Sequence, residues 1–333
     1  MHLTTRLKYA IKTMANVHRA GSAPDIFLFA TPRGGSTWLM EIIASQPGLK
    51  FYDEPLNPRR ENVAWSGRIP NWESLMPDTG DAEQVIGFLQ DLQAGRHGFM
   101  NPTPFRRHHR FFTNRIVFKI HEIEHLIDEV ARRCSAQIVY LLRHPIATSI
   151  SRHVLPRLDL FFACQYHTAL LNDPVCHAEI VSTATHGSFF QRAVISWCYE
   201  NLVALRSPNP DWLFVTYEEL VLNPERSCDL LLGRLQLSDR AAMLQAFERP
   251  ASNIELSHEQ TLAALHSPDA RQRRYRLVAK WQNEISLQQY AEAEHVLALF
   301  KVDAYDVRSP LAAGHFLHFD DTEVILQNSA TIK

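Results

Sequence analysis

Residues 26–42 read IFLFATPRGGSTWLMEI, and this stretch decides the fold. Its first six residues are apolar and suit a buried strand, whereas the segment Ser36–Ser45 predicts a helix. Between them lie two glycines, which let a backbone approach a ligand closely. The sequence therefore predicts a strand and a helix joined by a tight turn.

The turn carries the groups that an anion requires. Free N–H groups of the first helical turn point at one spot, with the positive end of the helix dipole behind them. Ser36 and Thr37 add hydroxyls, and Arg33 adds a permanent positive charge. The turn is not a kinase-type loop, because no lysine follows Gly35. We expect an oxyanion cradle; the alternative is a turn that binds nothing.

Apolar segments that suit strands alternate with segments that suit helices along the chain. Short, nearly continuous apolar strands of this kind indicate a parallel sheet buried on both faces. The sequence thus predicts an α/β fold whose central parallel sheet carries helices on both faces, within one domain over 24–306 and a tail over 307–333. Further strands are expected at 49–55, 115–121, 137–145 and 212–220, helices at 81–95, 123–133, 189–206 and from 224, and irregular structure at 156–188.

Composition and charge limit the classes of partner. The 333 residues are 46% hydrophobic with a net charge of −2, which argues against a nucleic-acid partner. No window is long and apolar enough for a membrane span. Residues 1–23 predict an amphipathic helix that packs on its own domain or, alternatively, contacts a membrane surface. The odd number of cysteines, five, favours reduced thiols and a cytoplasmic location.

Two motifs carry a resemblance to a known family. The segment PRGGSTWL resembles the 5′-phosphosulfate loop of sulfotransferases that use 3′-phosphoadenosine 5′-phosphosulfate (PAPS). The segment IVYLLRHPIATSISRH resembles the 3′-phosphate motif of that family, in which a strand ends in Arg and a Ser follows eight residues later. The matching residues here are Arg143 and Ser151. Taken alone, Arg143 could equally be a solvated charge at a strand end.

Two weaker matches extend the resemblance over residues 24–300. The segment TYEEL resembles the Tyr-Glu-Asp-Leu segment of the family and places Tyr217 near the adenine. Arg274 stands seven residues before Trp281, as in the closing loop of the family, although Tyr275 and Arg276 replace the usual Lys and Gly. The resemblance implies a P-loop-type fold with PAPS as co-substrate. It implies that PAPS is bound by Arg33, Gly34, Gly35, Ser36, Thr37, Trp38, Arg143, Ser151, Tyr217 and Arg274, although Trp38 could instead be a core residue.

Sulfuryl transfer requires a base for the acceptor hydroxyl and cations for the leaving phosphate oxygen. Arg33 and the N–H groups of the turn supply the positive charge for the leaving phosphate oxygen, so no metal is required. Lys119 and His121 reproduce the Lys-x-His of cytosolic sulfotransferases, in which His is the base. Glu54 resembles the acidic base of several bacterial and carbohydrate sulfotransferases. Both candidates stay open, and with them the acceptor: a carbohydrate, a glycolipid, or a small phenol or alcohol.

Two other functions remain as alternatives. The chain could be a non-catalytic module that binds the nucleotide. Residues 121–125, HEIEH, fit the zinc-hydrolase pattern H-E-x-x-H, but that pattern needs both histidines on one helix. We expect His121 to close a strand, so a metal site is not predicted here.

Overall fold

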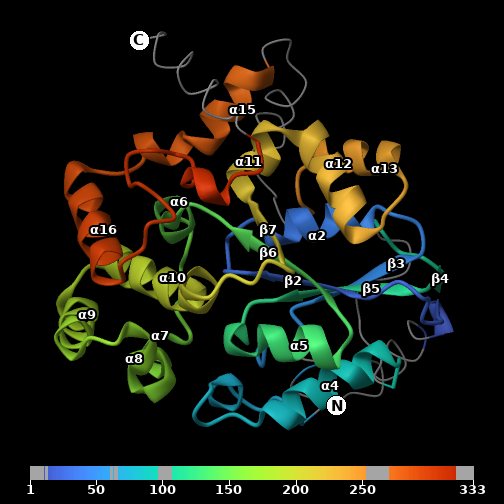
Figure 1. The fold of residues 1–333 in the computed structure, drawn as a ribbon, viewed down its shortest axis with the longest axis horizontal. Helices are drawn as coiled ribbons and strands as arrows, with labels where there is room; N and C mark the ends of the chain where they lie inside the picture. The colour runs from blue at the N-terminus through green and yellow to red at the C-terminus, as the bar shows by residue number, and fades with distance from the viewer. Residues whose placement is uncertain are drawn as a thin grey trace.

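The computed structural model describes residue 11 and residues 14–60, 63, 67–96, 107–252 and 270–319. Its centre is a five-stranded sheet in the order β3-β5-β2-β6-β7, and every neighbouring pair runs parallel (Figure 1). The strands are β2 (Ile26–Ala30), β3 (Leu49–Asp53), β5 (Arg115–Ile120), β6 (Gln137–Leu142) and β7 (Leu213–Thr216).

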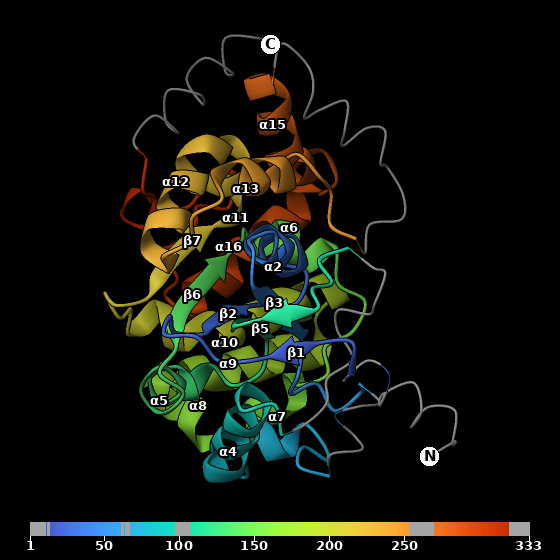
Figure 2. The same ribbon diagram turned by 90° about the vertical axis from the view of Figure 1, so that its right-hand side faces the viewer.

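Helices cover both faces of this sheet because its strands are apolar on both sides. Along β2, Phe27 and Phe29 enter one core while Ile26 and Leu28 enter the other. The first core lies under α4 (Ala82–Gln93), α5 (Ile127–Arg133) and α10 (Phe189–Arg206), and the second under α2 (Ser36–Ala44), α12 (Pro224–Leu235) and α13 (Arg240–Phe247) (Figure 2). The predicted α/β class with helices on both faces is confirmed.

The order of the strands decides where a ligand can bind. From the central strand β2 the chain passes to β3 and β5 on one side, and then crosses to β6 and β7 on the other. A crevice forms beyond the carboxyl ends of the strands at such a reversal. The ends of β5 and β6 flank the end of β2 there, and these three ends carry the turn, Lys119 and Arg143.

The prediction of irregular structure at 156–188 is wrong. The chain forms α7 (Leu158–Ala163), α8 (Gln165–Leu171) and α9 (Pro174–His186) there. Two of these helices are too short to show a clear period in the sequence, and α9 exposes most of its surface. Asp173 and Pro174 mark the start of α9, since the Asp173 side chain accepts a hydrogen bond from the Cys176 N–H.

The expected strand at 212–220 is also shorter in the structure. It ends at Thr216, whose side chain accepts a hydrogen bond from the Glu219 N–H and so caps α11 (Tyr217–Leu222). The Tyr-Glu-Glu-Leu segment is therefore helical. This cap sets Tyr217 at the start of a helix, directly beyond the carboxyl end of β7.

The helix expected at residues 1–23 is wrong for Val17 and His18. These residues form β1 (Val17–His18), which runs parallel to β4 (Phe112–Thr113), and the Asn16 side chain donates to the Arg110 carbonyl beside it. Residues 1–10 lie outside the described residues. In the described part of the chain, no helix is long and apolar enough to cross a membrane.

The fold continues beyond the boundary expected at residue 306. Leu311 is buried against Val221, and the Glu219 carboxylate accepts hydrogen bonds from the N–H groups of His318 and Phe319. The remaining α-helices are α6 (Pro145–Ile150), α15 (Ala270–Val278) and α16 (Leu287–Leu299). Short 3₁₀-helices are labelled η: η1 (Glu73–Leu75), η2 (Glu124–Leu126), η3 (Lys280–Asn283) and η4 (Gly314–Phe316).

Candidate active site

The turn after β2 has an unusual backbone. Arg33 has φ 68° and Gly35, the N-cap of α2, has φ 90°. A side chain at Gly35 would place a Cβ 2.5 Å from Cδ2 of Tyr217, so only glycine fits this position. The N–H groups at the start of α2 have no partner within the helix. The turn can therefore present them to a ligand.

A cavity of about 630 Å³ lies against this turn. Its size is typical of a site for a small molecule or cofactor. The turn, the ends of β3, β5 and β6, and the helices α11, α13 and α15 all contribute to it. Of the residues predicted for the site, Gly34 alone is not in its lining; those that line it are Arg33, Gly35, Ser36, Thr37, Trp38, Glu54, Lys119, His121, Arg143, Ser151, Tyr217 and Arg274.

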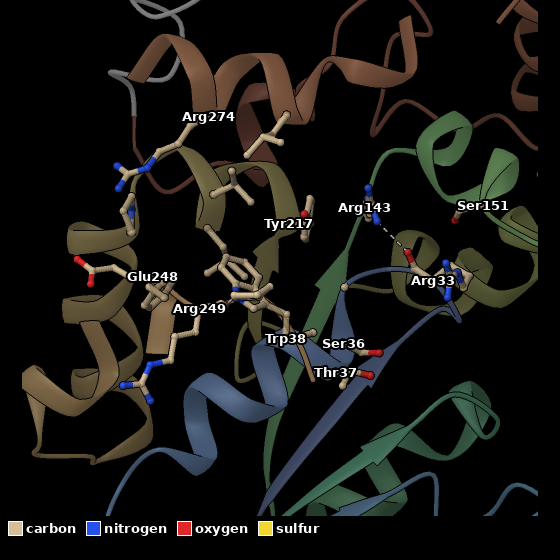
Figure 3. A pocket seen from close by; sticks show the side chains of 18 of the residues that line it. Arg33, Ser36, Thr37, Trp38, Arg143, Ser151, Tyr217, Glu248, Arg249 and Arg274 are labelled. Carbon is tan, nitrogen blue, oxygen red and sulfur yellow. Dashed lines mark hydrogen bonds between the residues drawn. The ribbon is translucent and has the colours of Figure 1, made fainter. Parts of the chain in front are cut away.

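Arg143 and Arg33 both line this cavity, and the Arg143 side chain contacts the main chain of the turn at Arg33. Nη1 of Arg143 donates a hydrogen bond of 3.0 Å to the carbonyl oxygen of Arg33 (Figure 3). The Arg143 guanidinium also stacks on the Tyr217 ring, 4.2 Å from its centroid. Ser151 ends α6 nearby, and its hydroxyl donates to the Thr148 carbonyl. Two arginines, one in the turn after β2 and one directly after β6, thus line one cavity.

Lys119 connects β5 to the turn and to the end of β3. Its ammonium donates to Oγ1 of Thr37 at 3.0 Å and lies 3.2 Å from Oε1 of Glu54. It also forms an ion pair with Asp53. The Lys119 side chain is only 3% exposed, so these contacts hold a buried cation in a fixed position.

His121 follows β5 directly and is buried. Its Nδ1 bonds to the Ala30 carbonyl oxygen, which can only accept, so Nδ1 carries the proton. Nε2 then carries the lone pair, which accepts a hydrogen bond of 3.5 Å from Oγ of Ser36, and Nε2 lies 3.7 Å from Oε1 of Glu54. Burial, together with the charge of Lys119, lowers the pKa of His121 below its usual value. The ring is therefore neutral at physiological pH.

Glu54, in contrast to the neutral His121, is ionised. Burial alone would raise its pKa, but Lys119 and Arg60, together with the His121 ring when that ring is protonated at low pH, outweigh burial and bring the pKa below its usual range. The Asn57 amide donates to Oε2 of Glu54 at 2.8 Å. Glu54 has φ 54°, so the turn after β3 aims its side chain from a conformation that few residues adopt. The carboxylate is ionised and already partnered.

The far end of the cavity is built from helices. Trp38 meets the rings of Tyr217 and Phe247 edge to face, at 5.7 and 5.6 Å, and its Nε1 donates to the Arg249 carbonyl. Figure 3 shows Arg274 and Arg249 on this side, across the cavity from Arg33. The sequence did not predict the contribution of α13, because nothing in an amphipathic helix indicates which cavity it lines.

The HEIEH segment has no zinc-hydrolase geometry. His121 follows a strand, whereas His125 lies in η2 with its ring 6.1 Å from that of Tyr166. Glu124 instead forms a buried ion pair with Arg157. Among the residues that the structure describes, no group of three or more His, Cys, Asp or Glu side chains could hold a metal ion.

Comparison with known proteins assigns the class. The family model described as "Sulfotransferase family" matches residues 24–240. This match covers more than half of the chain, and the chain therefore belongs to the sulfotransferase family. No curated protein matches the chain.

Solved structures of two sulfotransferases are similar to it. Mouse sulfotransferase SULT7A1 complexed with PAP has 16% identity and a TM-score of 0.40, with 96% of this chain and 93% of that chain covered. The sulfotransferase domain of the Synechococcus PCC 7002 olefin synthase has 18% identity and a TM-score of 0.42, with 86% and 97% covered.

Proposed function

We propose that this sulfotransferase uses PAPS and transfers its sulfuryl group to a hydroxyl or amine of a carbohydrate, glycolipid or small-molecule acceptor. PAPS has charged groups at both ends of an adenosine. The observation that carries the proposal is that Arg33 and Arg143, from different strands, line the same cavity as His121. A ligand with two separated anionic groups matches this arrangement.

The donor site divides between the two ends of the nucleotide. Arg33, the N–H groups at the start of α2 and the hydroxyls of Ser36 and Thr37 would hold the 5′-phosphosulfate. Arg143 and Ser151 would hold the 3′-phosphate. The adenine would lie against the aromatic rings, which are those of Trp38, Tyr217 and Phe247.

The reaction needs a fixed cation beside the leaving oxygen. A bond from the acceptor oxygen to sulfur forms while the bond from sulfur to the phosphate oxygen breaks, and adenosine 3′,5′-bisphosphate (PAP) leaves. Negative charge grows on that phosphate oxygen. Lys119 and Arg33 lie where they can stabilise this charge, and Thr37 orients Lys119 through its hydroxyl.

The contacts of the two candidate bases favour His121. Its ring is neutral, and Nε2 carries a lone pair whose hydrogen-bond partner, the Ser36 hydroxyl, lines the cavity together with His121. Glu54 is a weaker base, because its cationic neighbours keep its pKa low. At 3.7 Å from Nε2, the Glu54 carboxylate can instead stabilise the imidazolium that forms when His121 accepts the acceptor proton. We assign His121 as the base and Glu54 as its electrostatic partner.

Incubation of the purified chain with sulfur-labelled PAPS and a panel of glycans, glycolipids, phenols and amines tests this function. We expect label on at least one acceptor class and an equal amount of PAP. Arg33→Ala should abolish transfer, while Arg132→Ala, a surface arginine outside the cavity, should not. Binding of PAP without transfer to any acceptor would support a nucleotide-binding module, and failure to bind PAP would overturn the proposal.

A further inference from the structure

Two arginine–glutamate ion pairs lie buried behind the cavity, and both arginines come from the segment that follows α6. Arg152 pairs with Glu200, and these side chains are 3% and 4% exposed. Arg157 pairs with Glu124, and these are 4% and 10% exposed. A buried ion pair is weak evidence for stability, because desolvation offsets the attraction of its charges. The remaining hydrogen bonds of each arginine therefore indicate what the pair does.

Arg152 also bonds to the turn after β2, called here the donor loop, and to α10. Nη2 donates to the carbonyl oxygen of Pro32 at 3.3 Å, and Nη1 donates to Oγ of Ser196 at 3.1 Å. The Pro32 carbonyl belongs to the same planar peptide unit as the N–H of Arg33. Fixing that oxygen therefore fixes the direction of this N–H and the start of a turn in which Arg33 has a positive φ.

Arg157 donates its remaining hydrogen bonds to the segment that follows β5. Nη2 donates to the carbonyl oxygen of His121 at 2.6 Å, and Nη1 donates to that of Glu122 at 2.7 Å. Both carbonyls follow directly after β5. The side chain of His121 is thus held by Ala30, while its main chain is held by Arg157. Neither Arg152 nor Arg157 is among the residues that line the cavity.

We propose that the two pairs are separate positioning devices: Arg152–Glu200 sets the geometry of the donor loop, and Arg157–Glu124 sets the position of His121. The proposal rests on the proposed function. Glu200 lies on α10 and Glu124 in η2, so each arginine connects a site segment to a different element of the same core. The pairs should therefore control different steps, nucleotide binding in one case and turnover in the other.

The same conservative substitution at both positions separates these effects. A lysine keeps the charge but cannot bond two oxygens of a carboxylate and a main-chain carbonyl with one planar group. We expect Arg152→Lys to weaken PAP binding about tenfold through the loss of charge-assisted hydrogen bonds. We expect Arg157→Lys to leave PAP affinity unchanged and to lower kcat about tenfold or more, because small displacements of a reacting group are costly.

The experiment measures three quantities on the full chain: PAP affinity by titration calorimetry, kcat and KM for PAPS with an acceptor from the panel, and the melting temperature. The two variants are matched controls, since substitution, burial and partner are alike. A merely structural role would lower both melting temperatures without a split between affinity and kcat, and that result would overturn the proposal. Glu200→Gln and Glu124→Gln, which retain oxygen acceptors, give the same comparison where a lysine variant does not fold.

The wild-type chain distinguishes two kinds of failure. If it does not bind PAP, the proposed function is wrong and this inference falls with it. If it binds PAP and transfers label, but the two pairs show no split, the function stands and the positioning roles are wrong.

Discussion

The two ends of the cavity are built in different ways. At the end formed by β3 and β5, Lys119 and His121 are buried, and each lies within 4 Å of the partly buried Glu54 carboxylate. At the end formed by α13 and α15, aromatic rings meet edge to face, and Nε of Arg274 is buried without a hydrogen-bond partner among the described residues. One end comes from strand ends of a shared sheet, and the other from separate helices.

This difference indicates how binding and reaction are divided. Groups that act on a developing charge must not reorganise during the reaction, so they are held by strands and by mutual contacts. In the proposed function the helical rim binds the nucleotide base, and this role needs area and shape more than exact placement. Substitutions at the strand end should therefore change turnover, and substitutions toward the helical rim should change affinity by decreasing amounts.

His121→Asn should have the largest effect. Loss of a general base costs about 10²–10⁴-fold in rate, so kcat should fall by this order while calorimetry shows unchanged PAP affinity. His125→Asn is the matched control, because His125 is buried four residues away but does not line the cavity. A His121 variant that retains kcat would show that His121 is not the base. Glu54 would then be the base, and the roles assigned to His121 and Glu54 would be reversed.

The pH profile of the wild-type enzyme sharpens the same assignment. The pKa of His121 is lowered, so the base remains neutral when pH falls below the usual histidine value near 6.5. We expect kcat/KM to stay constant from pH 8 to about pH 6.5 and to decline only at lower pH. If kcat/KM instead fell with a midpoint above pH 6.5, the assignment of His121 as a buried base with a lowered pKa would be wrong.

Arg143→Ala should have an intermediate effect. Loss of a charge-assisted phosphate contact costs about 1–3 kcal/mol, and calorimetry with PAP measures it. Because Arg143 also holds the Arg33 carbonyl, affinity for adenosine 5′-phosphate, which has no 3′-phosphate, should fall as well. Unchanged PAP affinity would remove Arg143 from the donor site.

Arg274→Gln should have the smallest effect. Its guanidinium is half-buried at the rim, where charge contacts are screened and contribute about 1 kcal/mol or less. PAP affinity should decrease slightly, and its dependence on salt should become weaker. A loss of PAP affinity as large as that of Arg143→Ala would show that Arg274 on α15 contributes as much to nucleotide binding as Arg143 does.

The site residues near the sheet were predictable because local sequence places them. A residue at the carboxyl end of a buried strand lies at the binding edge in any parallel α/β sheet. This rule locates Arg33, Lys119, His121 and Arg143 from apolar runs alone. The helices α7 and α8 and the strand at Val17 were not predictable, since short elements owe their conformation to packing rather than to periodicity. The longer helix α9 was missed because it buries few residues and so shows no clear apolar face.

By itself, the sequence determined the α/β class, the glycine turn after β2 and the strand ends that carry basic residues, because strand burial and glycine geometry act over a few residues. Only the tertiary structure decided which candidate base is neutral, since the pKa values of His121 and Glu54 depend on burial and on charges from other strands. It also decided that Arg152 contacts the turn after β2 and that Arg157 contacts the segment after β5. Those contacts join residues more than 30 positions apart, so no local sequence pattern could predict them.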